Sequence, residues 1–369
     1  MTIRRSTGQT QRHIGKNLVS ADLVGANCNA LLNGCFRVAQ RGTSFTAATG
    51  LPNDDGNYTL DRWLLVTNGD DVADVSQDTS TVPDGSYASM KVDVETANKK
   101  FAIAQIIEAK DTARLWDNQN GVVSLSFQAI TEAGPEVGNL RAAVLAWTGA
   151  ADTITTAGDN SDFLSAWNAA GSDPTWDASL TCENTPSNLA LSTSWQRFEI
   201  TNIALDTAGT TNLVVFIWTD DDDMAAEDVF WIADVQLEPG PYATPFQQRL
   251  ITEELELCHR YYQQTYDHGT MPGTAANTNG VLMLGNVGYA WAPNQAHLTW
   301  QFKSRMRSVP TVTPYAPTTG NVNNCTDLTD SGDETATVIY VGDSSATFKV
   351  TGNPGVTGLI FHGTADAEL

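Results

Sequence analysis

The chain of 369 residues lacks the short motifs that mark common catalytic and phosphate-binding sites. It contains no G-x-S-x-G nucleophile elbow, no H-E-x-x-H zinc motif, no Walker loop and no G-x-G-x-x-G loop. Its five His residues are scattered, and its five Cys residues form no C-x-x-C pair. We therefore expect no catalytic residues and no enzyme activity, although 43 acidic residues leave room for a glycosidase-type carboxylate pair that no motif marks.

Basic residues are also scarce. Twenty Lys and Arg residues stand against 43 Asp and Glu residues, which gives a net charge of −23. A surface this acidic repels phosphate backbones and anionic membranes, so we expect no nucleic acid among the partners. No run of about 18 apolar residues is present, which predicts no membrane insertion. The first residues lack an apolar segment and a small-residue cleavage site, so we expect no secretory signal; free thiols then fit assembly in a reducing cytoplasm.

A long stretch of helical periodicity is missing from residues 28–247. Short apolar runs such as 121–127, 140–147 and 213–218 have the length and β-branched content of strands, and clusters of Gly, Asn, Asp and Pro separate them. This even punctuation predicts one β-sandwich or jelly roll. A single short helix is expected within it, at 161–170.

The period changes at residues 248–268. Ile251, Leu255, Cys258 and Tyr262 follow one another at spacings of four, three and four, which indicates one face of a helix. The predicted fold class is therefore all-β, with an N-terminal jelly-roll β-sandwich, a connecting helix and a smaller C-terminal β-sandwich. The expected parts are an N-terminal docking arm (1–27), the jelly roll (28–247), a linker helix (248–268) and the C-terminal β-domain (269–369).

The N-terminal arm is basic, in contrast to the acidic remainder. Residues 1–21 contain no acidic residue but carry Arg4, Arg5, Arg12 and Lys16. Such a segment is either a solvated tail or an arm that docks on an acidic partner. We favour docking and take the four basic residues as its candidates.

Three Trp residues lie in polar, loop-like context: Trp116, Trp167 and Trp176. A Trp ring beside Asp or Asn can stack on a sugar while the polar groups bind its hydroxyls, so these three are candidate glycan contacts. Ordinary packing is the alternative for each. Four other Trp residues lie in strand-like runs or beside them and are expected in the core: Trp147, Trp195, Trp218 and Trp231.

The acidic run Asp220–Asp223 follows a predicted strand. It has two interpretations, a solvated hairpin loop or a Ca²⁺-binding loop, because Ca²⁺ takes several oxygen ligands. The run lacks the D-x-D-x-D-G spacing of an EF-hand, which favours the solvated loop.

Two parts of the sequence resemble a family of phage tail-fibre and virion proteins. Residues 29–45 (NALLNGCFRVAQRGTSF) and 58–63 (YTLDRW) resemble that family's N-L-L-x-N-G-x-F-x-x-x-Q-R-G-x-S-F opening and its Y-x-x-D-R-W motif. Residues 243–249 (ATPFQQR) followed by 253–262 (EELELCHRYY) are similar to its A-T-P-F-E-x-R and E-E-L-x-L-C-x-R-Y-Y junction.

Other segments extend the resemblance. Residues 194–199 (SWQRFE) and 232–240 (IADVQLEPG) look like the late strands of carbohydrate-binding-module jelly rolls, and 306–312 (MRSVPTV) resembles the small β-sandwich that follows the junction. These modules often hold a structural Ca²⁺, and Asp234 stands where the family often has an acidic ligand, whereas Ala233 replaces a second Asp. We expect no other cofactor, and Asp234 is the candidate metal ligand.

The resemblance implies a bacteriophage virion structural protein, in a tail fibre or similar appendage that adsorbs to host surface glycans. It implies assembly in the host cytoplasm, location in the virion, attachment to other virion proteins through the arm, and a homotrimer by family analogy. The alternatives are a capsid decoration or head-fibre protein, a polysaccharide depolymerase, and a secreted carbohydrate-binding module of a larger hydrolase.

Overall fold

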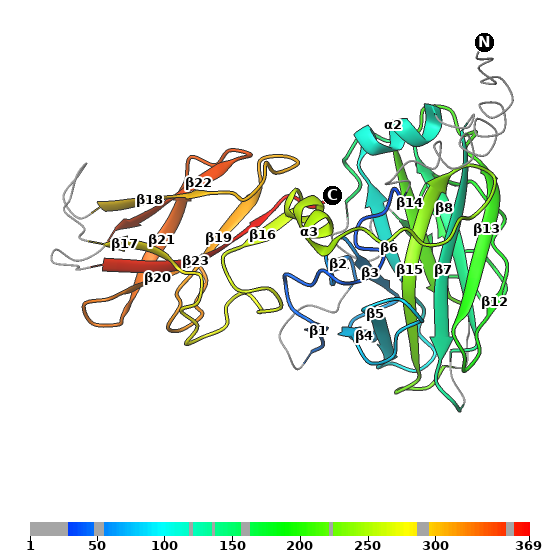
Figure 1. Ribbon diagram of the computed structural model, residues 1–369, viewed down its shortest axis with the longest axis horizontal. Helices are drawn as coiled ribbons and strands as arrows, with labels where there is room; N and C mark the ends of the chain where they lie inside the picture. The colour runs from blue at the N-terminus through cyan, green and yellow to red at the C-terminus, as the bar shows by residue number, and fades with distance from the viewer. Residues whose placement is uncertain are drawn as a thin grey trace, which may run out of the picture.

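The structure is a computed structural model, and it confirms the predicted all-β class with two β-sandwich regions joined at a short helix (Figure 1). The residues described are 29–47, 55–117, 121–134, 137–155, 163–220, 224–285, 295–351 and 358–369. The predicted docking arm, with Arg4, Arg5, Arg12 and Lys16, lies outside the described residues. No helix within them is long and apolar enough to span a membrane.

The N-terminal region is a sandwich of two antiparallel sheets. In spatial order, the first sheet contains β1 (Ser44–Phe45), β4 (Ala73–Asp78), β5 (Ser89–Val94), β15 (Val229–Pro239), β7 (Val122–Thr131) and β13 (Gln196–Ala204). The second contains β11 (Leu180–Cys182), β8 (Asn139–Trp147), β14 (Asn212–Thr219), β6 (Phe101–Ile107), β3 (Leu64–Thr67) and β2 (Asn57–Tyr58), with β12 (Leu189–Ala190) also paired to β8.

The central strands of the second sheet are buried on both faces. In β14, Leu213, Val215 and Ile217 join the core between the two sheets, whereas Phe216 and Trp218 join a second apolar cluster on the opposite face. A strand covered on both faces has no polar alternation, which explains why the sequence shows an unbroken apolar run here.

The cover of that outer face includes a small hairpin of β9 (Leu164–Ala166) and β10 (Thr175–Trp176). The helix expected at 161–170 is therefore wrong. Leu164 is buried in the outer cluster, and the Asn168 side chain donates to the carbonyl oxygen of Asp173 at 2.7 Å. Such local side-chain bonds favour a turn over a helix.

Two helices are found among the described residues. The sequence did not indicate α2 (Ala109–Asp117), which is short and lies between strands β6 and β7. The connecting helix α3 (Ile251–His259) is shorter than the 248–268 range because β16 (Tyr262–Gln264) pairs with the last strand. On the expected apolar face, Cys258 is buried but Ile251 is 40% exposed.

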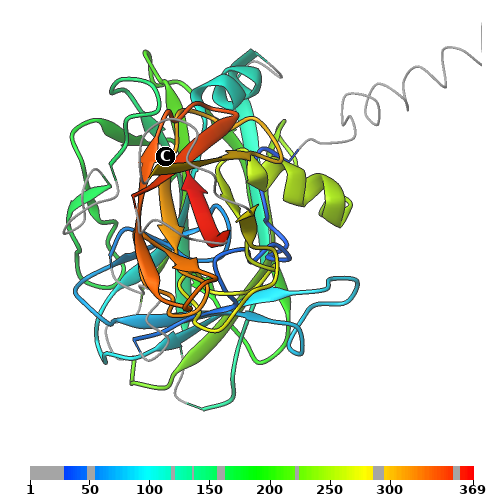
Figure 2. The same cartoon turned by 90° about the vertical axis from the view of Figure 1, so that its left-hand side faces the viewer.

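The C-terminal region is the smaller β-sandwich. Its strands are β16, β17 (Leu282–Gly285), β18 (Gln295–Gln301), β19 (Thr311–Tyr315), β20 (Asn324–Asp327), β21 (Asp333–Ile339), β22 (Ser345–Thr351) and β23 (Gly358–Asp366). Strand β23 pairs with β16, β17, β19 and β20, and Trp300, Phe348 and Phe361 pack in the core. In the view turned by 90°, this region stands in front of the N-terminal sandwich (Figure 2).

Candidate functional site

The residues that carry the phage-protein resemblance meet in space and hold the chain together. The Asn33 side chain closes a turn with both backbone groups of Val38, at 2.8 and 2.9 Å, and its backbone carbonyl accepts the Trp63 indole N–H at 3.0 Å. The Asn33 N–H donates to Glu254 of α3, which pairs with Arg249 at 3.1 Å. These motif residues are buried and structural.

A second set of bonds reaches the C-terminal region. The Gln40 side chain donates to Asp61 at 2.6 Å and to the Tyr262 carbonyl oxygen at 3.0 Å. Arg41 Nη2 lies 3.2 Å from both Asp366 Oδ2 and Glu368 Oε1. The motif at 29–45 therefore joins the jelly roll to the last strand of the chain.

Trp116 lines a pocket of about 530 Å³ between α2 and the loop that connects β13 to β14. Its ring is half-buried and packs against the sandwich core, so the core holds the ring in place. The complete lining is Ala109, Thr112, Ala113, Trp116, Asp206, Ala208, Gly209, Thr210 and Thr211. Of the three predicted glycan contacts, Trp116 is the one that lines a described pocket.

The loop opposite Trp116 is held by Glu183. The Glu183 carboxylate accepts the Asp206 N–H at 2.8 Å and the hydroxyl of Thr207. Gly209 has a φ of +82°, in the left-handed region that favours glycine. The pocket thus combines one large aromatic ring with Asp206 and Thr hydroxyls on a braced loop.

Trp167 and Trp176 lie elsewhere, on the outer face of the second sheet. Their rings pack on Phe216, with centroids 6.1 and 5.3 Å apart respectively, and Trp176 meets Trp218 edge-on at 5.7 Å. Both are partly buried in the outer apolar cluster. The structure brings these two rings together but not with Trp116, and their contact with a glycan stays a prediction.

Asp234 sits at a β-bulge in β15, with a positive φ of 54°. Its carboxylate accepts hydrogen bonds from Ser86 Oγ and Gln128 Nε2, each at 2.7 Å. Burial raises the pKa of Asp234, and the two hydrogen bonds, which act to lower it, offset only part of this effect. No group of three or more His, Cys, Asp or Glu residues with metal-site geometry occurs in the described part of the chain. Ca²⁺ binding at Asp234 stays a prediction.

The acidic run has one described member. Asp220 is buried, and its carboxylate accepts the Gly171 N–H at 3.0 Å and lies 3.9 Å from Arg141. Residues 221–223 lie outside the described residues. Asp220 therefore anchors the loop that covers the outer sheet face.

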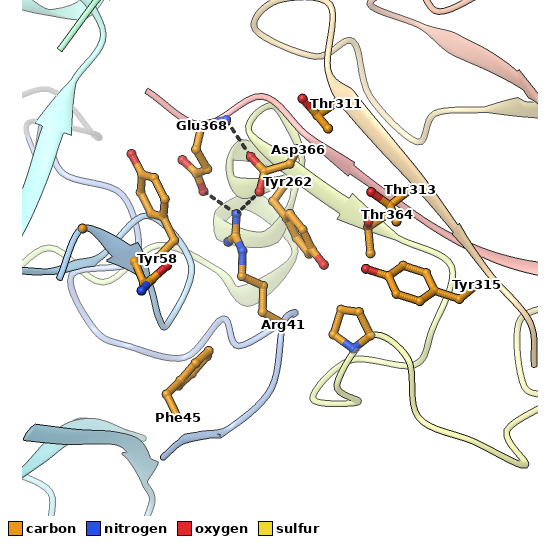
Figure 3. A pocket seen from close by; sticks show the side chains of 13 residues that line it. Arg41, Phe45, Tyr58, Tyr262, Thr311, Thr313, Tyr315, Thr364, Asp366 and Glu368 are labelled. Carbon is orange, nitrogen blue, oxygen red and sulfur yellow. Dashed lines mark hydrogen bonds and ion pairs between the residues drawn. The ribbon is translucent and has the colours of Figure 1, made fainter. Parts of the chain in front are cut away.

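A second pocket, of about 570 Å³, lies between the two β-regions and was not expected from the sequence (Figure 3). Its walls come from segments far apart in the chain. The lining residues are Arg41, Phe45, Gly56, Asn57, Tyr58, Tyr262, Pro272, Thr311, Thr313, Tyr315, Thr364, Asp366 and Glu368. Arg41, Phe45, Tyr58, Tyr262 and Thr311 fall within segments that resemble the phage proteins, but no sequence pattern indicated that these segments meet.

An ion-pair cluster forms one wall of this inter-region pocket. Glu368 pairs with Arg62 as well as with Arg41, and the Arg41 guanidinium lies 3.8 Å from the centroid of the Tyr262 ring. Burial raises the pKa of Glu368, although both guanidinium groups act in the opposite direction. The Asp366 side chain is 42% exposed and the Glu368 side chain 5%, so Asp366 is the carboxylate that solvent reaches.

No protein-family model and no curated protein matches the chain. Solved structures similar to it include the enzymatically active domain of tailspike protein 4 of bacteriophage CBA120, at 12% identity over 57% of this chain and 21% of that one, with a TM-score of 0.31. A second is a family 61 carbohydrate-binding module in complex with β-1,4-galactotriose, at 13% identity over 48% of this chain and 88% of that one, with a TM-score of 0.28. A third is a xylan-binding domain of Paenibacillus barcinonensis Xyn10C, at 14% identity over 48% of this chain and 87% of that one, with a TM-score of 0.28. The chain spans about a fifth of the tailspike chain.

Proposed function

We propose that this chain is a non-enzymatic structural protein of a bacteriophage virion, in a tail fibre or similar appendage, and that it adsorbs to host surface glycans through the Trp116 pocket. The observation that carries the glycan assignment is the Trp116 ring, packed on the core and lining a pocket with Asp206. The virion assignment is supported by the sequence resemblance at 29–45, 58–63 and 243–262.

The pocket matches the chemistry of a sugar. A pyranose presents an apolar C–H face and a rim of hydroxyls, and small-molecule sites pair apolar walls with a few polar groups. Trp116 supplies a flat apolar surface, and Asp206 and Thr210 supply oxygen atoms beside it. The small side chains of Ala113 and Ala208 leave room for a ring.

The remaining parts of the proposal concern assembly. The arm at 1–27 attaches the protein to other virion proteins, and the mature particle carries the protein as a homotrimer assembled in the host cytoplasm. The arm carries four basic residues and no acidic residue in 1–21, which favours docking on an acidic partner.

A glycan-binding assay on the full chain tests the pocket. We expect Trp116→Ala to weaken binding to host surface glycans at least tenfold, because the stacking surface is lost, while the far-UV circular dichroism spectrum stays unchanged. Tyr340→Ala is the matched control, since this aromatic ring is 79% exposed in the C-terminal region. Equal affinity of the Trp116→Ala variant and the parent chain would rule out the pocket.

Antibody labelling of intact particles in the electron microscope tests the location. Label on tail appendages supports adsorption, label over the head supports the decoration alternative, and unlabelled particles refute the virion role. Deleting residues 1–21 should give a folded protein that is absent from purified particles. Release of reducing sugar from host polysaccharide would favour the depolymerase alternative instead.

A further inference from the structure

The inter-region pocket has the composition of a binding site of its own. Tyr58 comes from the jelly roll, Tyr262 follows α3, and Tyr315 lies on β19 of the C-terminal region (Figure 3). Its volume of about 570 Å³ lies in the range of small-molecule pockets. Aromatic rings on several walls and polar groups between them suit a ligand that is both apolar and hydroxylated.

The polar groups of this pocket differ in how far a ligand can reach them. Arg41 lines the pocket, but its side chain is about nine-tenths buried, and its Nη2 is bound to Asp366 and Glu368. Asp366, with a side chain that is 42% exposed, would accept hydroxyl hydrogens from a ligand.

Around this wall, the carboxylates of Asp61, Asp366 and Glu368 outnumber the two guanidinium groups. Arg41 and Arg62 stand against Asp366 and Glu368, and Glu368 contacts both guanidinium groups. An anionic ligand would meet the Asp366 carboxylate with no unshared cation to hold it, which costs free energy in a partly desolvated site. A neutral ligand avoids that cost.

We propose that the inter-region pocket is a second binding site, for a neutral saccharide with adjacent hydroxyl groups. Asp366 accepts from one hydroxyl, and Thr311 and Thr313 bond to others. Tyr315 offers an aromatic wall to the C–H face of the sugar. This site is separate from the Trp116 pocket and uses none of its residues.

A ligand here would touch both β-regions at once. Asn57 and Tyr58 belong to the jelly roll, whereas Thr311 and Tyr315 belong to the C-terminal region. Binding therefore stabilises the folded junction between the two regions by mass action.

Isothermal titration calorimetry on the full chain tests the site with a panel of neutral mono- to trisaccharides of glucose, galactose and xylose, each hexose beside its uronic acid. We expect binding of at least one neutral sugar and at least tenfold weaker binding of the matching uronate. Asp366→Asn should weaken the neutral sugar at least tenfold. Asp343→Asn is the matched control, because it removes a carboxylate that pairs with Arg305 at 2.7 Å outside the pocket.

A second pair of variants covers the case in which Asp366→Asn disturbs folding. Thr311→Trp should fill the pocket and abolish binding without removing a buried contact, because Thr311 is exposed on β19. Thr299→Trp, at an exposed position on β18, should bind as the parent does.

Three results would overturn the proposal: no neutral sugar of the panel binds, the uronates bind as tightly, or Thr311→Trp binds unchanged. Trp116→Ala separates the two sites, since it should leave this binding intact even where host-glycan adsorption is lost. Loss of both together would refute the existence of an independent second site.

Discussion

Replacing Glu368 by Gln tests whether the ion pairs at the junction between the two regions are as buried as the structure shows. Glu368 is buried and contacts Arg62 and Arg41. Arg41 would keep Asp366, but Arg62 would keep only the Ile106 carbonyl oxygen at 2.7 Å and the Tyr261 ring, 3.7 Å away. Removing one partner of a buried ion pair costs about 3–5 kcal/mol. Because the Gln amide oxygen can still accept one hydrogen bond, we expect a loss of about 3 kcal/mol in the free energy of unfolding.

Denaturant unfolding followed by tryptophan fluorescence measures this loss. Glu256→Gln is the control, because Glu256 is an exposed acid on α3 and should change stability by less than about 0.5 kcal/mol. Adding Arg62→Met to Glu368→Gln should restore part of the stability, since the unpaired charge is then gone. A loss below about 1 kcal/mol in the single variant would refute the reasoning, because it would mean that water reaches Arg62.

Three further predictions concern other buried groups. Burial lowers the pKa of His259 to about 4, so the folded state favours the neutral imidazole. The free energy of unfolding that this preference contributes is complete above about pH 6.5 and should fall by about 2–3 kcal/mol towards pH 4.5. Denaturant unfolding curves should show this pH dependence in the parent chain and not in His259→Gln. Burial raises the pKa of Cys325 to about 12 and that of Cys182 to about 11, so native-state alkylation at pH 8, read by peptide mass spectrometry, should be slow at both and become fast only on unfolding. Gly34→Ala would press a Cβ into the carbonyl oxygen of Val235, and soluble yield and unfolding midpoint should both drop, whereas an unchanged midpoint would contradict the close approach.

The jelly-roll strands could be predicted because each buried strand is a short apolar run that can be recognised from its own residues. The run 213–218 is apolar throughout since sheet and cover bury both of its faces, and no tertiary detail is needed to recognise it. The end of α3 could not be predicted this way. Tyr262 continues the helical spacing, yet it pairs with Asp366, more than one hundred residues away, and that pairing overrides the local preference.

Of the two pockets, the one beside Trp116 was partly predictable from the sequence and the inter-region pocket was not. Trp116 could be selected from the sequence as a large ring in polar context, but so could Trp167 and Trp176, and only the fold shows that these two pack on Phe216. The inter-region pocket could not be predicted, because Arg41 and Asp366 come together only when both ends of the described chain meet beside Tyr262 of β16.

The central strand β23 of the C-terminal region receives two attachments at its end. Strand β16 pairs with it at Asp366, and the residues that follow reach the jelly roll, where the Tyr58 hydroxyl donates to the Leu369 carbonyl oxygen at 2.9 Å. A single flexible linker would let the two regions rotate freely, whereas two neighbouring attachments resist that rotation. The C-terminal region should therefore keep a fixed orientation relative to the jelly roll. A partner that binds one region in a larger assembly then also sets the orientation of the other.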